Sequence, residues 1–380
     1  MTVPVTTTIF PGRYLQGRNA MTRLGEFTKL LGATPLIVAD DAVWGFVADV
    51  VTASLKDVDL PVVREGFCGL ATAKEVDRLT QVIKDTNSDI VLAVGGGNTI
   101  DAVKAAGHLA GVRWASIPTV ASTDAPTSAL SVIYTEDGAF EEYRFFPKNP
   151  DLVLVDTQIC ANAPLEFLVG GIGDALATWL EARATRRAAA ATMAGGLPTH
   201  TGTALAELSW NLIHENAIAA IEAVKENLVT PAVEALVEAN TLLSGVGFES
   251  GGLAAAHAIH NGLTFAPQTH GLTHGQKVNI GSVTQLVLEH APMKDIEDFV
   301  IFTTRVGLPN TLTEVGLKTT DEKELRGIAD TATVAGETIH NMPFPVTAED
   351  VYLALKSIEG LSRRIRSEAG LPEPEFYTAH

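Results

Sequence analysis

Three segments in the second half of the sequence carry the acidic and imidazole side chains best suited to hold a metal ion. They are GGIGDALATWLEA with Asp174, GGLAAAHAIHNGL with His257 and His260, and THGLTHGQKV with His270 and His274. One carboxylate and two imidazoles are suitable ligands for a catalytic zinc ion, which takes three protein ligands and keeps one position open. Each residue also has an ordinary alternative, because Asp174 could open a helix as an acid facing its dipole and a histidine can be a hydrogen-bonded structural residue. Taken alone, these residues favour the structural interpretation over metal binding.

A glycine turn in the first half of the sequence is suited to bind a phosphate group. The segment DIVLAVGGGNTIDAVKAAGH predicts a strand, a turn of three glycines and a helix. Glycines let the backbone approach a ligand, and a helix N-terminus presents unpaired N–H groups to a phosphate. The turn lacks the Gly-x-Gly-x-x-Gly fingerprint of dinucleotide-binding domains, so a tight turn without a ligand is an equal alternative.

Asp40 follows the apolar segment PLIVA, at the carboxyl end of the first predicted strand. Doubly wound sheets bind their ligands at this edge. An acid there can hydrogen-bond the ribose hydroxyls of an adenosine and repels a 2′-phosphate, which favours NAD over NADP. The alternative is a helix N-cap, and Asp41 competes with Asp40 for either role.

The elements that would position these residues change character near residue 162. Before that point, predicted strands alternate with predicted helices, which indicates a parallel sheet with right-handed crossovers. The strands are expected at 35–40, 60–65, 89–94 and 114–118, and the helices at 41–56, 72–87 and 98–111, with Thr72 and Glu75 as a capping box. The later sequence is rich in Ala, Leu, Glu and Gly with helical spacing. We therefore predict an α/β nucleotide-binding domain with a parallel sheet over 1–162 and an all-α metal- and substrate-binding domain over 163–380.

Composition excludes several classes of protein. The formal net charge of −18 disfavours nucleic acid and anionic membranes as partners, which call for basic patches. The two cysteines, Cys68 and Cys160, form no Cys-x-x-Cys pair, and no apolar run reaches the ~20 residues that span a bilayer. The first residues lack the order of a signal peptide. We expect a soluble, reduced protein of the cytoplasm.

Six segments, in this order along the chain, resemble the glycerol dehydrogenase family of the iron-containing, or polyol, alcohol dehydrogenase superfamily. They are FPGRYLQG, VGGGNTIDAVKA, IPTVASTDAPTSALSVIY, GGIGDALATWLEA, GFESGGLAAAHAIHNGLT and THGQKV. The resemblance covers essentially the whole chain and implies the dehydroquinate-synthase-like fold of that superfamily and a homo-oligomer, often an octamer. It implies NAD-dependent oxidation of glycerol to dihydroxyacetone, and of related vicinal diols, by zinc-assisted hydride transfer in glycerol metabolism.

The resemblance also implies roles for individual residues. Asp174, His257 and His274 would bind zinc, and Asp124, within ASTDAP, would contact the polyol, so these four are the expected catalytic residues. Without the resemblance, Asp124 would be taken for a solvent-facing turn residue bonded to its own backbone. The residues that the resemblance assigns to NAD are Asp40, Gly97, Asn98, Thr99, Ile100, Asp101, Thr119, Val120, Ala121, Ser122, Ser128, Leu130 and Tyr134.

Two positions bear on how this sequence fits the superfamily. The glycine turn usually reads Gly-Gly-Gly-Lys, and Asn98 replaces the lysine, which predicts a weaker attraction for the cofactor phosphates. The iron-dependent branch has a histidine one helical turn after its metal-binding aspartate. Thr178 occupies that position here, so the three-ligand zinc pattern fits better.

Three other functions stay open at this point. A glycerol-1-phosphate dehydrogenase and a dehydroquinate-synthase-like lyase share the fold, but a phosphorylated substrate calls for several basic residues beside the metal segments. Only Lys277 lies close to them in sequence. A nucleotide-binding protein without turnover would have no need for Asp174, His257 and His274.

Overall fold

The computed structural model describes residues 5–378. Residues 1–4, where the segment compared with signal peptides begins, and residues 379–380 lie outside the described residues. The chain divides into two compact units, which we name the sheet unit (Ile9–Leu168 and Glu222–Gly245) and the helical unit (Met1–Thr8, Val169–Ile221 and Val246–His380). The functional division at residue 162 stays a prediction.

The sheet unit contains most of the strands. Its elements are β2 (Tyr14–Gly17), η1 (Ala20–Arg23), α1 (Leu24–Lys29), β3 (Pro35–Ala39), α2 (Asp41–Lys56), β4 (Val63–Gly66), α3 (Ala73–Asp85), β5 (Ile90–Gly95), α4 (Gly97–Ala110), β6 (Arg113–Pro118), β7 (Leu130–Tyr134), β8 (Phe140–Phe145), β9 (Leu152–Asp156), α5 (Thr157–Asn162), α8 (Pro231–Glu238) and η2 (Ala239–Leu243). Helices dominate the rest of the chain: α6 (Leu165–Ala188), α7 (His200–Lys225), α9 (Ser244–Gly251), α10 (Ala255–Leu263), η3 (Pro267–Thr269), α11 (His274–Leu288), α12 (Met293–Arg305), η4 (Thr313–Val315), α13 (Glu322–Ala332), η5 (Thr338–Asn341) and α14 (Ala348–Glu368), with the short strands β1 (Thr6–Thr7) and β10 (Leu197–Pro198).

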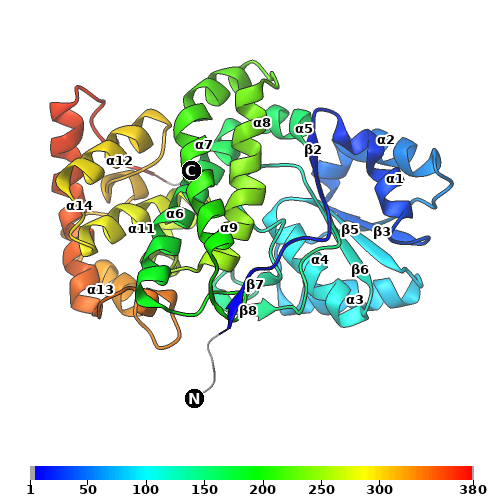
Figure 1. Cartoon of the computed structure of the whole chain (residues 1–380), viewed down its shortest axis with the longest axis horizontal. Helices are drawn as coiled ribbons and strands as arrows, with labels where there is room; N and C mark the ends of the chain where they lie inside the picture. The colour runs from blue at the N-terminus through cyan, green and yellow to red at the C-terminus, as the bar shows by residue number, and fades with distance from the viewer. Residues whose placement is uncertain (1–4, 379–380) are drawn as a thin grey trace. The chain divides into compact units, whose positions relative to one another are not determined.

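Six strands of the sheet unit form one parallel sheet, in the order β2-β9-β6-β5-β3-β4 (Figure 1). The predicted parallel α/β fold is thus confirmed. From β3 the chain crosses to β4 on one side, whereas from β5 it crosses to β6 on the other. The carboxyl ends of β3 and β5 therefore form the topological switch point, where such sheets bind ligands. Asp40 and the glycine turn follow these two ends.

The strands β3, β5 and β9 are buried along their whole length, which explains why they are almost entirely apolar, whereas the edge strands β2 and β4 are less buried and carry polar residues. On β3, Ile37 and Ala39 pack into a core with residues of α1 and α2. Leu36 and Val38 point the opposite way and pack with residues of α3 and α4. A two-residue period thus fills two cores from one strand.

The predicted capping box at the start of α3 forms only in part. Thr72 accepts a hydrogen bond from the backbone N of Glu75 at 3.2 Å, as an N-cap should. The carboxylate of Glu75 does not return to Thr72. It accepts from the backbone N of Cys68 and pairs with Arg78 at 2.7 Å, because a charge-assisted bond to a guanidinium is the stronger alternative.

Asp174 does not open a helix, contrary to the alternative that the sequence suggested for it. Helix α6 begins at Leu165, nine residues earlier, and runs through Gly170, Gly171 and Gly173 without a break. These glycines therefore lie in the interior of the helix, and Asp174 is in its third turn.

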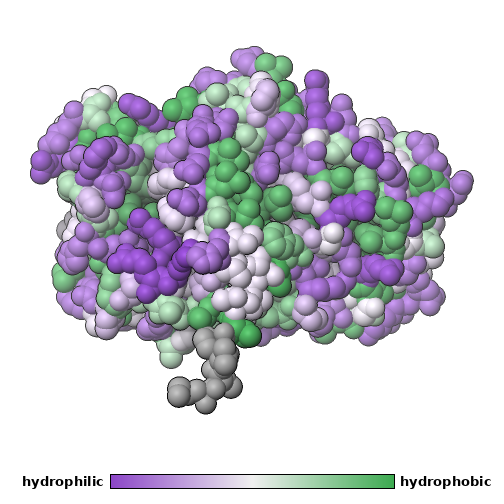
Figure 2. All heavy atoms as spheres, in the orientation of Figure 1, coloured by the Kyte–Doolittle hydropathy of each residue, from purple (hydrophilic) through white to green (hydrophobic). Residues whose placement is uncertain are grey.

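No helix among residues 5–378 has the length and apolarity needed to cross a bilayer. On the face drawn in Figure 2, hydrophilic residues are spread widely with hydrophobic ones between them.

Candidate metal centre

Three helices of the helical unit bring Asp174, His257 and His274 together. One carboxylate oxygen of Asp174 lies 3.3 Å from Nε2 of His257 and 3.1 Å from Nε2 of His274. The three ligand atoms all lie within 4.8 Å of one another. Ligands at about 2.1 Å from a tetrahedral zinc ion are about 3.4 Å apart, so these separations match a shared ion.

Glycines on α11 allow the three helices to approach closely enough for this convergence. A Cβ at Gly275 would lie 1.7 Å from the carbonyl oxygen of Gly170 on α6, and one at Gly281 would lie 2.1 Å from that of Ala256 on α10. Neither position tolerates a side chain, because backbone atoms would have to move. This contact brings His274 close to Asp174. His274 comes one residue before Gly275 on α11, and Asp174 comes four residues after Gly170 on α6.

Glu181, which was not predicted from the sequence, contacts the ring of His257. Its Oε2 accepts a hydrogen bond from Nδ1 of His257 at 2.5 Å, and both side chains are buried. An imidazole with its proton on Nδ1 keeps the lone pair of Nε2 free for a metal, the usual arrangement in zinc sites. Glu181 is seven residues, or two helical turns, after Asp174, so both lie on one face of α6. That spacing was the available signal.

The charged groups of this cluster shift one another's pKa values. Burial opposes ionisation of Asp174, but the charge of His274 and hydrogen bonds from both histidines hold its pKa well below the usual range. Burial lowers the pKa of His257, but the charges and hydrogen bonds of Glu181 and Asp174 outweigh it and raise the pKa well above the usual value. A cation is therefore favoured between these carboxylates, and a divalent ion can replace the proton.

The other two candidate histidines are not among the three converging ligands. His270 is exposed, and its Nε2 lies 2.9 Å from the carbonyl oxygen of Thr264. His260 is buried with its ring centroid 4.2 Å from that of His274, but its Nδ1 contacts the side chain of Asn261 at 3.1 Å. Thr178 is fully buried and is not one of the three grouped ligands.

The glycine turn of the sheet unit leads into a helix without a side-chain cap. Helix α4 has Gly96 as its N-cap, which has no side chain to accept from the first N–H groups. A Cβ at Gly95 would lie 2.7 Å from Oγ1 of Thr99, so only glycine fits. The side chain of Asn98 accepts from the backbone N of Ala71 at 3.3 Å. This end of α4 has the features of a phosphate site.

Asp40 is the N-cap of α2. Its Oδ1 accepts from the backbone N of Val43 at 2.7 Å. Of the two acids that could cap this helix, Asp40 is therefore the N-cap and Asp41 is not. Asp41 is exposed and pairs with Arg64 at 2.5 Å. The carboxylate of Asp40 is partly buried at the switch point, and capping engages one of its two oxygens.

A buried ion pair joins α4 to the loop that carries most of the other predicted cofactor residues. Nζ of Lys104 lies 2.9 Å from Asp101, and it donates to the carbonyl oxygen of Ala125 at 2.8 Å and to Oγ of Ser128 at 3.1 Å. The other oxygen of Asp101 accepts from the backbone N of Val132. Lys104 was not predicted as a site residue, although a lysine three residues after an acid on a buried helix calls for a partner.

Asp124 lies in the same loop and is not the solvent-facing residue of the ordinary alternative. It is 8% exposed, and its Oδ2 accepts from Oγ of Ser244 at 3.1 Å. Its carbonyl oxygen accepts from the backbone N of Thr127. Asp124 therefore begins a turn, as the alternative expected, but its carboxylate is buried within the sheet unit and does not face solvent.

The remaining predicted cofactor residues flank the glycine turn or the loop after β6. The backbone N of Thr119 donates to the carbonyl of Gly95, which ties loop and turn together. Burial and the charge of Asp101 raise the pKa of Tyr134 to about 12, so its phenol stays protonated. The others are Gly97, Thr99, Ile100, Val120, Ala121, Ser122 and Leu130, of which Thr99, Ile100, Ala121 and Leu130 are buried.

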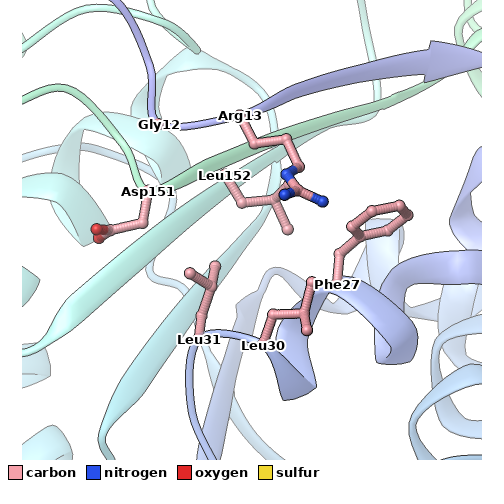
Figure 3. Close-up of a pocket in the computed structure, with 7 residues that line it drawn as sticks. All are labelled: Gly12, Arg13, Phe27, Leu30, Leu31, Asp151 and Leu152. Carbon is pink, nitrogen blue, oxygen red and sulfur yellow. The ribbon is translucent and has the colours of Figure 1, made fainter.

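A pocket of about 300 Å³ lies elsewhere in the sheet unit, at the amino ends of β2 and β9 (Figure 3). In Figure 3 the guanidinium of Arg13 points towards Phe27, whereas the carboxylate of Asp151 points away from them. That carboxylate pairs with Lys148 at 2.5 Å. None of the residues predicted for metal, cofactor or substrate lines this pocket.

Comparison with known proteins gives a consistent relationship. The family described as iron-containing alcohol dehydrogenase matches residues 11–157. A glycerol dehydrogenase of Escherichia coli is 49% identical over 94% of this chain and 98% of its own length. A glycolaldehyde reductase of Halobacterium salinarum is 46% identical over 95% of this chain and 99% of its own length.

A solved structure extends the relationship to the fold. The crystal structure of glycerol dehydrogenase from Schizosaccharomyces pombe has a TM-score of 0.95 and 37% identity, covering 99% of this chain and 96% of that chain. Identity above 30% over nearly the full length of both chains establishes common descent. The chain therefore belongs to the glycerol dehydrogenase family of iron-containing alcohol dehydrogenases and is an oxidoreductase.

Proposed function

We propose that this chain is an NAD-dependent glycerol dehydrogenase that works with a zinc ion held by Asp174, His257 and His274. The observation that carries the proposal is the convergence of one carboxylate oxygen and two imidazole nitrogens within 4.8 Å. The relatives named glycerol dehydrogenase, at 46–49% identity, support the same assignment.

A zinc ion at this place would act as a Lewis acid on the reacting oxygen of the substrate. The chain's own part is to present three ligands and leave the fourth position open. Asp174 supplies the negative charge, and Nε2 of His257 lies 3.3 Å from its carboxylate.

The NAD site in our proposal lies at the switch point of the sheet unit. The uncapped N-terminus of α4 would bind the pyrophosphate through backbone N–H groups, and Asp40 would accept hydrogen bonds from the ribose. Asn98 offers no positive charge to the phosphates. NAD bound at this place would supply the acceptor for the hydride that the substrate loses.

Asp124 is the residue that we assign to polyol recognition. A carboxylate that is 8% exposed can accept a hydrogen bond from a substrate hydroxyl with little competition from water. A vicinal diol can also offer two oxygens to one metal ion, which favours glycerol over simple alcohols. The proton that leaves the substrate would pass to water or to a second substrate hydroxyl.

Glycolaldehyde reduction is the second candidate activity. The relative from Halobacterium salinarum is named for it at 46% identity. Glycolaldehyde and dihydroxyacetone share a carbonyl next to a hydroxyl, so the same groups could bind either.

For this chain we also propose a location in the cytoplasm and a homo-oligomeric state. Light scattering of the purified protein would test the oligomeric state.

One absorbance assay of NADH separates these functions. Purified protein is treated with a chelator, reloaded with zinc and given glycerol, glycerol phosphate or, in the reducing direction, glycolaldehyde and dihydroxyacetone. We expect turnover with glycerol and dihydroxyacetone that chelation abolishes and zinc restores. Turnover with glycerol phosphate alone, or a rate that chelation does not affect, would contradict the proposal.

A further inference from the structure

Helix α10, which carries His257, begins without a cap of its own. Its N-cap residue is Ala254, which has no side-chain acceptor. The first four N–H groups of a helix find no partner within the helix, and here they belong to Ala254, Ala255, Ala256 and His257. All four residues are buried, so water does not replace the missing acceptors.

Two side chains from neighbouring helices accept all four bonds. Oε1 of Glu181, on α6, accepts from the backbone N of Ala254 at 2.8 Å and of His257 at 2.9 Å. Oε1 of Gln285, on α11, accepts from the backbone N of Ala255 at 3.1 Å and of Ala256 at 3.0 Å.

Both acceptors lie on the helix faces that carry the metal ligands. Glu181 is seven residues after Asp174 and Gln285 is eleven residues after His274, which are close to two and three whole helical turns. The helices that supply the other two ligands therefore also hold the start of α10.

The second polar atom of each side chain sets the two residues apart. Oε2 of Glu181 accepts from the ring Nδ1 of His257 at 2.5 Å. Nε2 of Gln285 donates to the carbonyl of Leu180 at 3.0 Å and to Glu289 at 2.9 Å. Only Glu181 therefore touches the ring of a metal ligand.

We propose that Glu181 is a positioning residue of the metal centre, which holds His257 in the tautomer whose Nε2 lone pair faces the ion, while Gln285 is a structural cap. The inference rests on the proposed metal centre. Carboxylates that bind the far nitrogen of a ligating histidine act in this way in zinc proteins generally.

The variant Glu181→Gln separates the two duties of Glu181. Its amide oxygen can still accept from the backbone N of Ala254 and His257, but its amide nitrogen then faces Nδ1 of His257. A donor in that place favours the tautomer with the proton on Nε2, which blocks the ligand atom. Gln285→Ala is the matched control, because it removes two caps of α10 and leaves the Glu181–His257 contact intact.

The measurements are zinc affinity, by competition of full-length metal-free protein with a chromogenic chelator, and the melting temperature of the metal-free protein. We expect Glu181→Gln to weaken zinc binding about 10- to 100-fold while its amide oxygen keeps the two backbone caps of α10. Gln285→Ala should lower the melting temperature and leave zinc affinity unchanged. In a His257→Ala background, Glu181→Gln should have no further effect on zinc, because it acts through that ring.

Three outcomes would overturn the inference. Wild-type zinc affinity in Glu181→Gln, with zinc lost in His257→Ala, would remove the positioning role and keep the metal centre. An equal loss of zinc affinity in Gln285→Ala would make the effect one of helix capping. A wild-type protein that binds no zinc would overturn the proposed metal centre and this inference with it.

Discussion

The two candidate sites use their acidic side chains in opposite ways. In the helical unit, Asp174 faces two imidazole nitrogens that a metal ion would share. In the sheet unit, the predicted acids are engaged by the protein itself. Asp40 caps α2, Asp101 pairs with Lys104, and Asp124 accepts from Ser244. The metal centre is thus built from side chains. The proposed nucleotide site instead offers backbone N–H groups, and the acids near it also make contacts that stabilise the fold.

This difference predicts different costs for substitution. Removal of the partly exposed ligand His274 should abolish metal binding with little loss of stability. Removal of an acid or its partner in the sheet unit should lower stability and ligand binding together.

The largest effect is expected at His274. Its side chain is 29% exposed, so His274→Ala should fold normally. Loss of one of three ligands should remove zinc and reduce turnover by about 10³-fold or more, because Lewis-acid assistance is worth several kcal/mol. Elemental analysis measures the zinc content, and the NADH assay measures the turnover.

The control for His274 is His270→Ala, since His270 is exposed and contacts the backbone of Thr264. It should keep wild-type zinc and rate. A His274→Ala protein with full zinc content and rate would show that the ion, if any, is held elsewhere.

The next largest effect is expected at Lys104. Its side chain is 1% exposed and that of Asp101 is 8% exposed, so Lys104→Met leaves a buried charge without its cation. We expect a loss of about 3–5 kcal/mol in the free energy of unfolding. Urea unfolding followed by fluorescence measures it.

A double variant tests whether the cost at Lys104 comes from the buried charge. Asp101→Asn with Lys104→Met removes both charges and should recover much of the stability. If the double variant were less stable than Lys104→Met, Lys104 would act mainly through Ala125 and Ser128.

Asp124 should decide substrate choice. Loss of a hydrogen bond from a polyol hydroxyl to a buried charge costs about 3 kcal/mol, so Asp124→Ala should lower kcat/KM for glycerol about 10²-fold. 2-Propanol has no second hydroxyl to bind, so its kcat/KM should change much less. Asp124→Asn serves as the conservative companion. Equal losses on both alcohols would indicate a structural role through Ser244, and no loss on either would place Asp124 outside the substrate site.

The smallest effect is expected at Asp40. Asp40→Ala should weaken NAD about tenfold and narrow the preference over NADP, because a bond to a charged group is worth about 1.5–3 kcal/mol. It should also cost about 1 kcal/mol of stability through the lost cap.

Asp40→Asn separates these two losses, since asparagine caps helices as well as aspartate does. The Asp40→Asn protein should keep the wild-type free energy of unfolding, but its preference for NAD over NADP should decrease. Asp41→Ala is the control, because Asp41 is exposed and pairs with Arg64. A wild-type protein that uses both cofactors equally would contradict the proposed role of Asp40.

Local pattern determined four of the six strands of the main sheet, β3 to β6, and the helices α2, α3 and α4, whereas β2 and β9 were not predicted. The uniform apolarity of PLIVA and of IVLAV predicts strands buried on both faces, and β3 and β5 lie there. The alternation with amphipathic stretches then requires parallel pairing, because a parallel crossover needs a helix. These properties depend on neighbours in sequence, so they can be read without a structure.

Tertiary contacts decided the partners of the polar residues. The spacing of Glu181 from Asp174 and of Lys104 from Asp101 is a local signal, but it does not name a partner. The partners of Glu181, Gln285 and Lys104 lie far along the chain or on another element. The start of α6 was misjudged for a related reason, since Gly173 serves a close contact with the backbone of Gly275 rather than a turn.

The sequence by itself determined the α/β fold of the first half, the helical character of the second and, through family resemblance, which residues to examine. Only the tertiary structure brought Asp174 to within 3.3 Å of two histidines 83 and 100 residues further along the chain. The physical reason is that helix periodicity is local, whereas the approach of α6, α10 and α11 depends on glycines whose contacts lie on other helices.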